Sequence, residues 1–384
     1  MARNQKPVKI KRYKNTFNST GAKKRAVGRV LLWTLFFAAI FAAAFFLAKP
    51  LTNFIKNAFD RARLPSSSVS EPQEPDAPPA TDGEEPGTPP VIAQPHGAAI
   101  VNISQLIDLG AAANLARSLA DAGVSEAVVV VKDAGGNIYY PSAVAMAAAG
   151  LSPTQLDLPS LIKAFSENGV TLTAKLYAYR DPIAASANRS AAVNYRGQEG
   201  VLWLDNAQDK GGKPWLSPYS AEAQQYILDM VAELTQMGFG HIVVDAVQYP
   251  AVYSLDYTGY GPAESTMTKE AALSQMVQKL AALEGEKGVR VSLEYPETAL
   301  RGADLVSYIV SPMTYGERSL LIDLNLAVDA VPDTGALTEL VNLAKQNGVE
   351  LVGARITGGA YGSEAFAAQR QAALDAGFHW VLAG

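Results

Sequence analysis

The chain has 384 residues, with 32 Lys and Arg against 37 Asp and Glu, and it contains no cysteine. The lack of cysteine excludes disulfides, thiol catalysis, zinc–thiolate sites and iron–sulfur clusters. The charge is unevenly divided, because residues 1–29 hold ten Lys or Arg and no acidic residue, which leaves 22 basic against 37 acidic residues in the remainder. Such an acidic body argues against a nucleic-acid partner, since phosphate binding needs a Lys/Arg face.

The histidines are few and scattered, at His96, His241 and His379. This distribution argues against a multi-histidine metal site and against a Ser-His-Asp triad. We therefore expect neither a metal nor an organic cofactor. His241 opens a predicted strand, where we expect a structural role.

An uncharged apolar run extends from Val30 to Ala48 and makes residues 27–48 long enough to cross roughly 30 Å of hydrocarbon as a helix. The basic residues before it predict a cytoplasmic tail, residues 1–26, and an extracytoplasmic body. A cleaved signal peptide is the alternative, since 42–44 offers small residues, but the long basic region and long apolar run favour an uncleaved anchor. We therefore expect a single-pass protein of the cell membrane, with the lipid bilayer as a partner.

Residues 49–96 connect this anchor to the rest of the chain. Their first part, 49–63, has the spacing of a short amphipathic helix, and 64–96 is rich in Pro, Ser, Glu and Asp. Such a segment lacks the large apolar residues of a core and is typical of an extended linker. Residues 97–384 remain as one soluble domain, which is large enough to be stabilised by its core alone.

Apolar, β-rich segments alternate with helical patterns through this domain. The predicted strands are 98–104, 126–133, 171–181, 241–250, 289–297, 304–315, 350–359 and 379–384, and clear amphipathic helices are predicted at 220–237, 268–284, 335–347 and 363–376. Strands that are apolar on both faces are typical of parallel sheets. Eightfold strand–helix alternation predicts a (β/α)8 TIM barrel, an α/β fold. A doubly wound open sheet is the alternative, but no Gly-rich phosphate loop follows the first strand.

Polar residues collect at the carboxyl ends of the predicted strands, where a TIM barrel carries its chemistry. In strand order they are Lys132, Asp133, Tyr179, Arg180, Asp181, Asp245, Gln248, Glu294, Glu297, Tyr315, Glu317 and Arg355. The opposite ends are mostly Gly, Val and Ala. The asymmetry predicts a functional mouth at the carboxyl ends.

Four segments, VVVKDAGGNIYYPS (129–142), YAYRDP (177–182), the run from Trp215 to Pro250 and SPMTY (311–315), resemble a bacterial family of unknown function that is described as glycoside-hydrolase-like. The resemblance implies a glycosidase-like TIM barrel over most of 97–384. The chain is a divergent member, because the family's Asp-Tyr-(Ile/Val)-Arg-Phe-Pro motif appears as DAVQYP at 245–250, and strand five ends in Glu294-Tyr295-Pro296.

Glycoside hydrolysis needs two carboxyl groups that flank the scissile bond. Asp245 and Glu294 end neighbouring strands, so we expect them to share a cleft, with Asp245 as nucleophile or base and Glu294 as acid. The alpha-amylase superfamily places its nucleophile and acid at the same strand ends. Alternatively, Asp245 bonds a loop amide or pairs with Lys132 or Arg355. The separation of the two carboxyl groups, which sets retention or inversion, does not follow from the sequence.

The remaining candidates are substrate-binding residues. They are Lys132, Asp133, Tyr179, Asp181, Trp203, Trp215, Gln248, Tyr249, Tyr315 and Arg355. Each has a structural alternative: Asp133 orders its own loop, Lys132 and Arg355 pair with buried acids, and the loop aromatics pack against the barrel rim. Two long loops after strands three and four carry most of these aromatics, and long loops often bear function.

The sequence therefore supports three hypotheses. The first is a cell-surface glycosidase-like enzyme that acts on a polysaccharide or cell-wall glycan by paired-carboxylate chemistry. The second is a catalytically inactive barrel that binds such glycans, and the third is an envelope scaffold. A close, solvent-reachable pair of Asp245 and Glu294 supports the enzyme, whereas a pair that is blocked or separated by a salt bridge argues against it.

Overall fold

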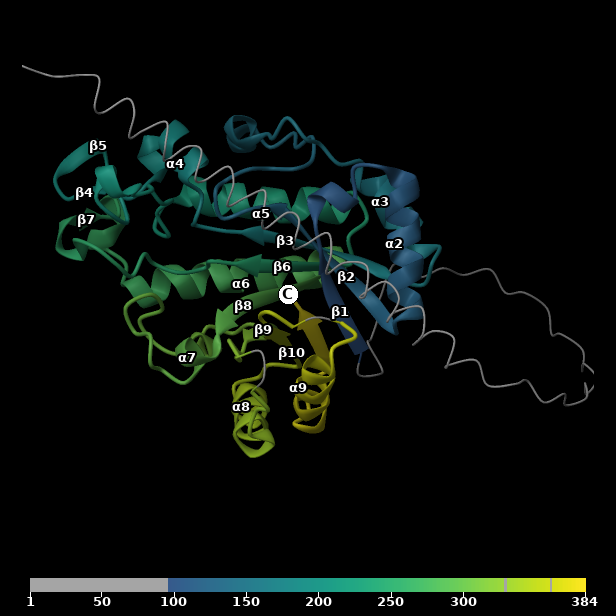
Figure 1. Ribbon diagram of the computed structural model, residues 1–384. Helices are drawn as coiled ribbons and strands as arrows, with labels where there is room; N and C mark the ends of the chain where they lie inside the picture. The colour runs from purple at the N-terminus through teal and green to yellow at the C-terminus, as the bar shows by residue number, and fades with distance from the viewer. Residues whose placement is uncertain (1–95, 328–329, 360) are drawn as a thin grey trace, which may run out of the picture. The chain divides into compact units, whose positions relative to one another are not determined.

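The computed structural model describes residues 96–327, 330–359 and 361–384 (Figure 1). The predicted basic tail, 1–26, the predicted transmembrane helix, 27–48, and the linker as far as residue 95 lie outside these ranges. No helix in the described ranges is long and apolar enough to span a membrane.

Within the described ranges, eight strands form a closed barrel in which every neighbouring pair is parallel. In barrel order they are β1 (His96–Val101), β2 (Val124–Lys132), β3 (Thr171–Tyr177), β6 (His241–Asp245), β8 (Arg290–Pro296), β9 (Ser319–Asp323), β10 (Leu351–Ile356) and β11 (Trp380–Ala383). The prediction of a (β/α)8 barrel is thereby confirmed.

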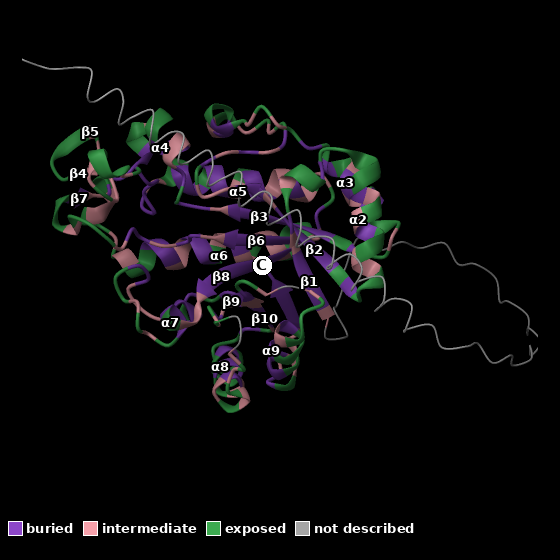
Figure 2. Cartoon of the chain, viewed as in Figure 1, coloured by how far each residue is buried: buried purple, intermediate pink, exposed green. Residues whose placement is uncertain are grey.

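Helices cover the outer face of the strands, with their buried sides turned inward (Figure 2). They are α2 (Leu109–Asp121), α3 (Leu158–Ser166), α4 (Pro182–Ala187), α5 (Ala221–Gln236), α6 (Lys269–Lys287), α7 (Glu297–Leu300), α8 (Thr334–Gln346) and α9 (Glu364–Asp375). Most begin at an Asp, Ser or Thr whose side chain accepts a backbone N–H, as Ser220 does from Ala223 and Thr268 from Ala271. The predicted helices at 220–237, 268–284, 335–347 and 363–376 match α5, α6, α8 and α9 closely.

The prediction of a sixth strand at 304–315 is wrong. This segment forms turns and a short 3-10 helix at Pro312–Thr314, and the strand that fills the sixth place is β9. Pro312 cannot donate a ladder hydrogen bond, which disfavours a central strand. The apolar character of the segment reflects burial of an irregular stretch, since Tyr308 and Met313 are buried. Tyr315 and Glu317 consequently precede β9 and do not end a barrel strand.

The loops after β3 and β6 meet in a small antiparallel sheet beyond the carboxyl ends of these strands. It contains β4 (Asn194–Tyr195), β5 (Gln198–Leu202) and β7 (Thr258–Gly259) (Figure 1). The buried indole of Trp203 donates to the carbonyl of Ser254 at 3.2 Å and joins the two loops further. These loops are therefore ordered by their own packing at the rim of the barrel.

The amino-terminal end of the barrel interior is polar, with a hydrogen-bond network centred on Glu126. Thr173 Oγ1 donates to Glu126 Oε1 at 2.6 Å, and His241 Nδ1 lies 2.6 Å from the same oxygen. His241 Nε2 contacts the Ser292 hydroxyl at 2.8 Å, which in turn contacts the Ser319 hydroxyl at 2.6 Å. Burial lowers the pKa of His241 against the attraction of Glu126, and the imidazole links Glu126 on β2 to Ser292 on β8.

On the carboxyl-terminal side of this polar layer lies an apolar layer. Ala98, Val128, Val243, Leu321 and Leu382 form it, with the indole of Trp380 below. Gly353 leaves room for that indole, because a Cβ at this position would lie 2.2 Å from the ring. The barrel centre is therefore a packed core and separates its two polar ends.

We predict that Glu126→Gln lowers the free energy of unfolding at pH 7 by about 1.5–3 kcal/mol, because charge-assisted hydrogen bonds are lost. Burial alone would raise the pKa of Glu126, but His241 and His96 hold it well below its usual value of 4.5. The stabilisation is thus present above pH 4.5 and is lost as the pH falls further. Thermal unfolding across pH tests this, with the exposed Glu167→Gln as control; equal acid sensitivity of wild type and Glu126→Gln would contradict it.

Candidate active site

A cluster of charged side chains fills the carboxyl-terminal end of the barrel interior. Lys175 Nζ lies 2.9 Å from Asp245 Oδ2 and also contacts Glu294 Oε2. Arg355 Nη1 lies 2.6 Å from Glu294 Oε1 and 3.7 Å from Asp323 Oδ2. These residues come from β3, β6, β8, β9 and β10, and we call Lys175, Asp245, Glu294, Asp323 and Arg355 the mouth cluster.

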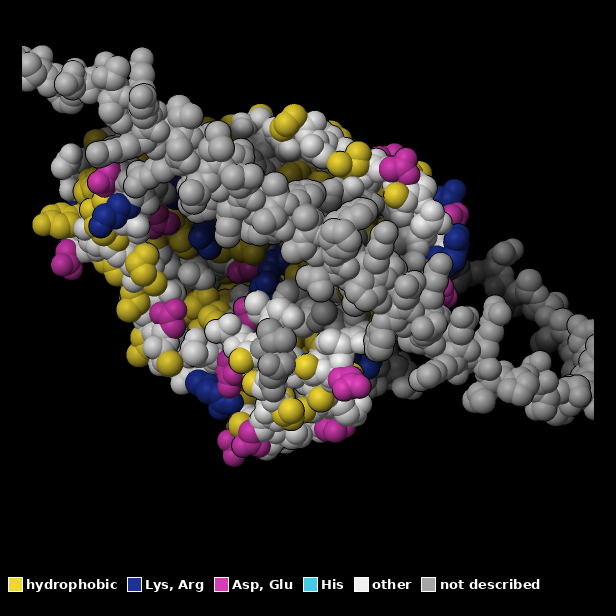
Figure 3. Space-filling view, viewed as in Figure 1, with side chains coloured by type: hydrophobic (Ala, Val, Ile, Leu, Met, Phe, Trp, Pro, Cys, Tyr) yellow, Lys and Arg dark blue, Asp and Glu magenta, His cyan; other side chains and the backbone are white. Residues whose placement is uncertain are grey.

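The mouth cluster is graded from buried to exposed. The side chains of Lys175 and Glu294 are only 2% and 4% exposed, whereas those of Asp245, Arg355 and Asp323 are 19%, 20% and 26% exposed. Solvent therefore reaches Asp245, Asp323 and Arg355 above a nearly dry Lys175–Glu294 pair. In Figure 3, basic and acidic atoms lie next to one another near the middle of the face shown, among hydrophobic atoms.

The backbone after Asp245 is strained in a way that fixes its carboxylate. Ala246 has a φ of 58°, a left-handed conformation that is uncommon for a residue with a Cβ. This turn lets the Ala246 N–H donate to Asp245 Oδ1 at 2.6 Å while Oδ2 faces Lys175. Both oxygens of Asp245 are thus held before any ligand binds.

Charge interactions set the protonation of the buried pair. Burial favours neutral Lys175, but the carboxylates of Asp245 and Glu294 outweigh this effect and raise its pKa, so the ammonium stays charged. Burial and the neighbouring Asp245 raise the pKa of Glu294, whereas Lys175 and Arg355 oppose this shift. The surroundings of Glu294 therefore increase the proton affinity of its carboxyl group.

Lys132 and Asp181 form a separate buried pair outside the mouth cluster. Their side chains are 0% and 1% exposed, with Lys132 Nζ 2.9 Å from Asp181 Oδ2. A register shift after Val130 turns Lys132 away from the barrel interior, and Asp181 also accepts from Tyr226 and caps α4. The pair is therefore buried beside the start of α4, which Asp181 caps, and beside Tyr226 of α5.

Asp133 is hydrogen-bonded within its own loop, and Gln248 is hydrogen-bonded to the segment between β8 and β9. Asp133 accepts backbone N–H groups from Gly135 and Asn137, each at 2.9 Å, as in the loop-ordering alternative. Gln248 Oε1 accepts from the Tyr308 hydroxyl at 2.6 Å. Both lie near strand ends, and the structure shows no hydrogen bond or ion pair between either one and the mouth cluster.

The five aromatic candidates are buried. Tyr179, Trp203, Trp215, Tyr249 and Tyr315 all pack within the hydrophobic core. Trp215 Nε1 donates to Asp205 at 3.0 Å, the Tyr249 hydroxyl to the Lys269 carbonyl at 3.1 Å, and the Tyr315 hydroxyl to the Tyr308 carbonyl. Their rings pack the rim, so a stacking surface for sugars would have to come from other residues.

Sequence reasoning missed two members of the mouth cluster, Lys175 and Asp323. Lys175 stands in an otherwise apolar run, two residues after Thr173 and two before Tyr177. Alternate residues of a strand face the same side, so this spacing indicates a charge that points into the barrel. Asp323 ends SLLID (319–323), an apolar run that closes on an acid just as HIVVD (241–245) closes on Asp245. The erroneous strand at 304–315 concealed the second pattern.

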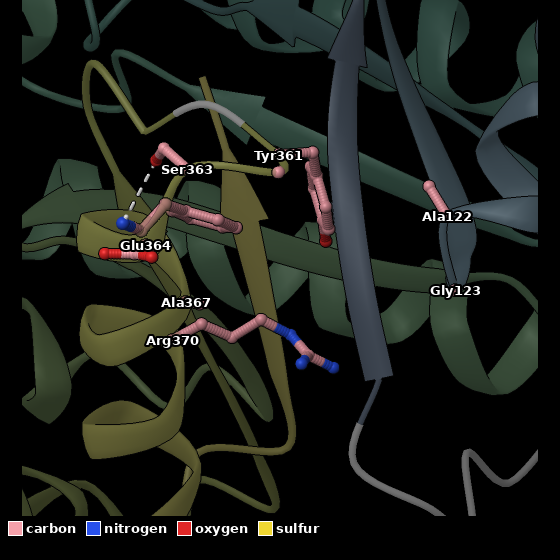
Figure 4. Close-up of a pocket in the computed structure, with 9 residues that line it drawn as sticks. Ala122, Gly123, Tyr361, Ser363, Glu364, Ala367 and Arg370 are labelled. Atoms are coloured by element: carbon pink, nitrogen blue, oxygen red, sulfur yellow. Dashed lines mark hydrogen bonds between the residues drawn. The ribbon is translucent and has the colours of Figure 1, made fainter. Parts of the chain in front are cut away.

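A cavity of about 460 Å³ lies elsewhere, between α9 and the turn after α2 (Figure 4). Tyr361, Phe366 and Arg370 line it, together with Glu364, the first carboxylate after β10. None of the mouth cluster lines this cavity. In the described ranges, no three His, Cys, Asp or Glu side chains are grouped so as to hold a metal ion.

We predict that Lys175→Met lowers the free energy of unfolding at pH 7 by about 3–5 kcal/mol, because two carboxylates lose their buried cation. The loss should shrink as the pH falls, since protonation removes the unpaired charge. Lys163→Met, which disrupts an exposed ion pair with Glu167, is the control and should cost at most about 0.5 kcal/mol. Chemical denaturation at pH 7 and pH 5 tests this, and equal losses in the two variants would refute it.

Several solved structures are similar to parts of this chain. The catalytic domain of beta-amylase from Paenibacillus polymyxa is similar, with 11% identity over 76% of this chain and 92% of that chain and a TM-score of 0.50. A hypothetical protein from Ruminiclostridium thermocellum ATCC 27405 has 20% identity over 51% of this chain and 96% of that one, with a TM-score of 0.43. A GH20 exo beta-N-acetylglucosaminidase from Vibrio harveyi has 11% identity over 68% of this chain and 41% of that chain, with a TM-score of 0.45.

At these identities, the likeness to beta-amylase shows the fold alone. No curated protein sequence matches the chain. Residues 109–295 match the family described as "Putative glycosyl hydrolase domain", and this range includes β2, β3, β6 and most of β8. The family resemblance seen in the sequence is thereby confirmed over residues 109–295.

Proposed function

We propose that the domain is a glycoside hydrolase that binds a polysaccharide or cell-wall glycan at the carboxyl-terminal mouth of its barrel. The observation that carries the proposal is the pair Asp245 and Glu294, which end β6 and β8 and contact one ammonium group, that of Lys175. Paired carboxyl groups at strand ends supply the acid and the base or nucleophile of glycoside hydrolysis. The match of residues 109–295 to the family described as "Putative glycosyl hydrolase domain" supports the same reaction class.

The two carboxyl groups differ in environment as the two roles require. Asp245 is partly exposed and bonded to Lys175 and to the Ala246 N–H, which suits an ionised nucleophile or base. Glu294 is almost fully buried, and its pKa is raised by burial and by Asp245. Pairs of titratable groups with contrasting environments commonly divide into base and acid.

Binding without turnover is the second candidate. Lys175 and Arg355 contact the two oxygens of Glu294, and both contacts favour the ionised carboxylate over the acid that must donate a proton. Lys175 also lies between the two carboxylates as a salt bridge, the arrangement that argues against hydrolysis. This observation keeps a catalytically inactive glycan-binding barrel as the alternative.

Asp245→Asn should lower kcat on the preferred glycan by about 10²–10⁴, because the nucleophile or base is removed. Activity should also fall as the pH rises through the raised pKa of Glu294, since the acid then loses its proton. The full-length protein is assayed for reducing-end release and binding on starch, xylan, chitin oligosaccharides and peptidoglycan. The exposed Asp209→Asn is the control, and binding without release, unchanged in Asp245→Asn, would establish the second candidate.

We further propose that residues 27–48 anchor the protein in the cell membrane, with residues 1–26 in the cytoplasm and the barrel outside it. The support is the uncharged run from Val30 to Ala48 and the ten basic residues in 1–29. The acidic, Pro-rich residues 64–96 would then separate the barrel from the bilayer. The barrel would in this way meet glycans of the cell envelope.

Deletion of 27–48 should release the protein from carbonate-washed membranes, because the apolar segment that crosses the bilayer is lost. Deletion of 64–85, a linker segment of equal length, should leave it in the membrane pellet. Quantitative immunoblotting of pellet and supernatant measures both. Recovery of the unaltered protein as a shorter soluble form would instead show a cleaved signal peptide.

A further inference from the structure

We infer that Lys175 is a positioning residue that holds Asp245 and Glu294 at the separation of a retaining glycosidase. Retaining enzymes act by double displacement through a covalent glycosyl-enzyme, and inverting enzymes by a single displacement with water. The inference rests on the glycoside hydrolase function proposed above and specifies the stereochemical course of its reaction.

The first step of the argument is a distance. One nitrogen, Lys175 Nζ, contacts Asp245 Oδ2 at 2.9 Å and Glu294 Oε2. The two oxygens are therefore no further apart than two contact lengths, about 6 Å. Retaining glycosidases place their carboxyl groups about 5–5.5 Å apart, whereas inverting ones need about 6.5–9.5 Å to admit a water molecule. The upper limit for the separation of this pair is therefore below the range of inverting enzymes, which indicates a retaining enzyme.

The second step is that this separation is fixed. Lys175 is buried on β3, and its ammonium group lies 5.0 Å from the centre of the Tyr177 ring. The outer oxygens are also held, Asp245 Oδ1 by the Ala246 N–H and Glu294 Oε1 by Arg355, each at 2.6 Å. Each carboxylate is thus bonded on both sides, and neither can move apart without breaking a buried ion pair.

The third step is the chemistry that this geometry permits. An Asp245 oxygen attacks C1 of the sugar, the bond from C1 to the leaving oxygen breaks, and that oxygen takes the proton of the Glu294 carboxyl group. Water then attacks C1, the Glu294 carboxylate accepts a proton from the water, and the bond between C1 and Asp245 breaks. Two inversions at C1 give net retention and restore both carboxyl groups.

Lys175 itself takes no part in bond formation. Its pKa is raised by the two carboxylates, so its nitrogen stays protonated and has no free electron pair. Its ammonium group instead holds the Asp245 carboxylate in place through the ion pair at 2.9 Å. It also opposes the rise in the pKa of Glu294, and its removal is therefore expected to move the loss of activity at high pH to a higher pH.

The test is proton NMR of the anomeric signals released by the full-length protein from maltooligosaccharides, chitin oligosaccharides and xylooligosaccharides, recorded before mutarotation. Retention of the substrate's anomeric configuration is the expected result. Release of the opposite anomer would overturn the inference and leave the proposed hydrolysis intact. Failure to release any product from these probes or from the glycan panel above would overturn both.

A second measurement examines Lys175 directly. Lys175→Met should lower kcat/KM at least tenfold and shift the high-pH limb of the activity profile upward, whereas Lys175→Arg should keep part of the activity and a profile nearer that of the wild type. Circular dichroism confirms that each variant is folded. A folded Lys175→Met whose pH profile is unmoved would show that Lys175 acts in stability alone.

Discussion

The geometry of the barrel mouth depends on one buried ammonium group, that of Lys175. A charged amine inside a protein is costly unless its partners are close and well oriented. Asp245 and Glu294 provide those partners from β6 and β8, and Arg355 on β10 extends the network to Asp323 on β9. One ion network thus joins five neighbouring strands, so the position of each carboxylate is set by the closure of the barrel and not by a mobile loop.

The interior of the barrel is divided into layers with different tasks. At the amino-terminal end, Glu126, Thr173 and His241 are buried and hydrogen-bonded to one another, so their polarity contributes to stability. The apolar layer of Val128 and Leu321 separates them from the mouth cluster. This arrangement agrees with TIM barrels in general, whose carboxyl-terminal face carries the chemistry and whose opposite face contributes stability.

Much of the fold followed from the sequence because alternation of apolar strands and amphipathic helices is a repeated signal. The sixth strand was misplaced because burial, and not strand geometry, makes 304–315 apolar. Asp245, Glu294 and Arg355 were expected at strand ends, and the structure brings these three together. The buried environments of Trp203 and Trp215 could not be foreseen, since aromatic rings in long loops suit a packed rim and a sugar-binding platform equally well.

The same contacts explain why the carboxylate pair alone does not decide between hydrolysis and binding. Cations on both sides of Glu294 fix its position, which proximity catalysis requires, but they also favour its ionised form, which acid catalysis must avoid. Burial and Asp245 act in the opposite direction. A glycan that fills the mouth would exclude water from Asp245 and Arg355 and strengthen every charge interaction beneath it. In the proposed enzyme, the bound glycan would therefore shift the balance at Glu294 between its ionised and protonated forms.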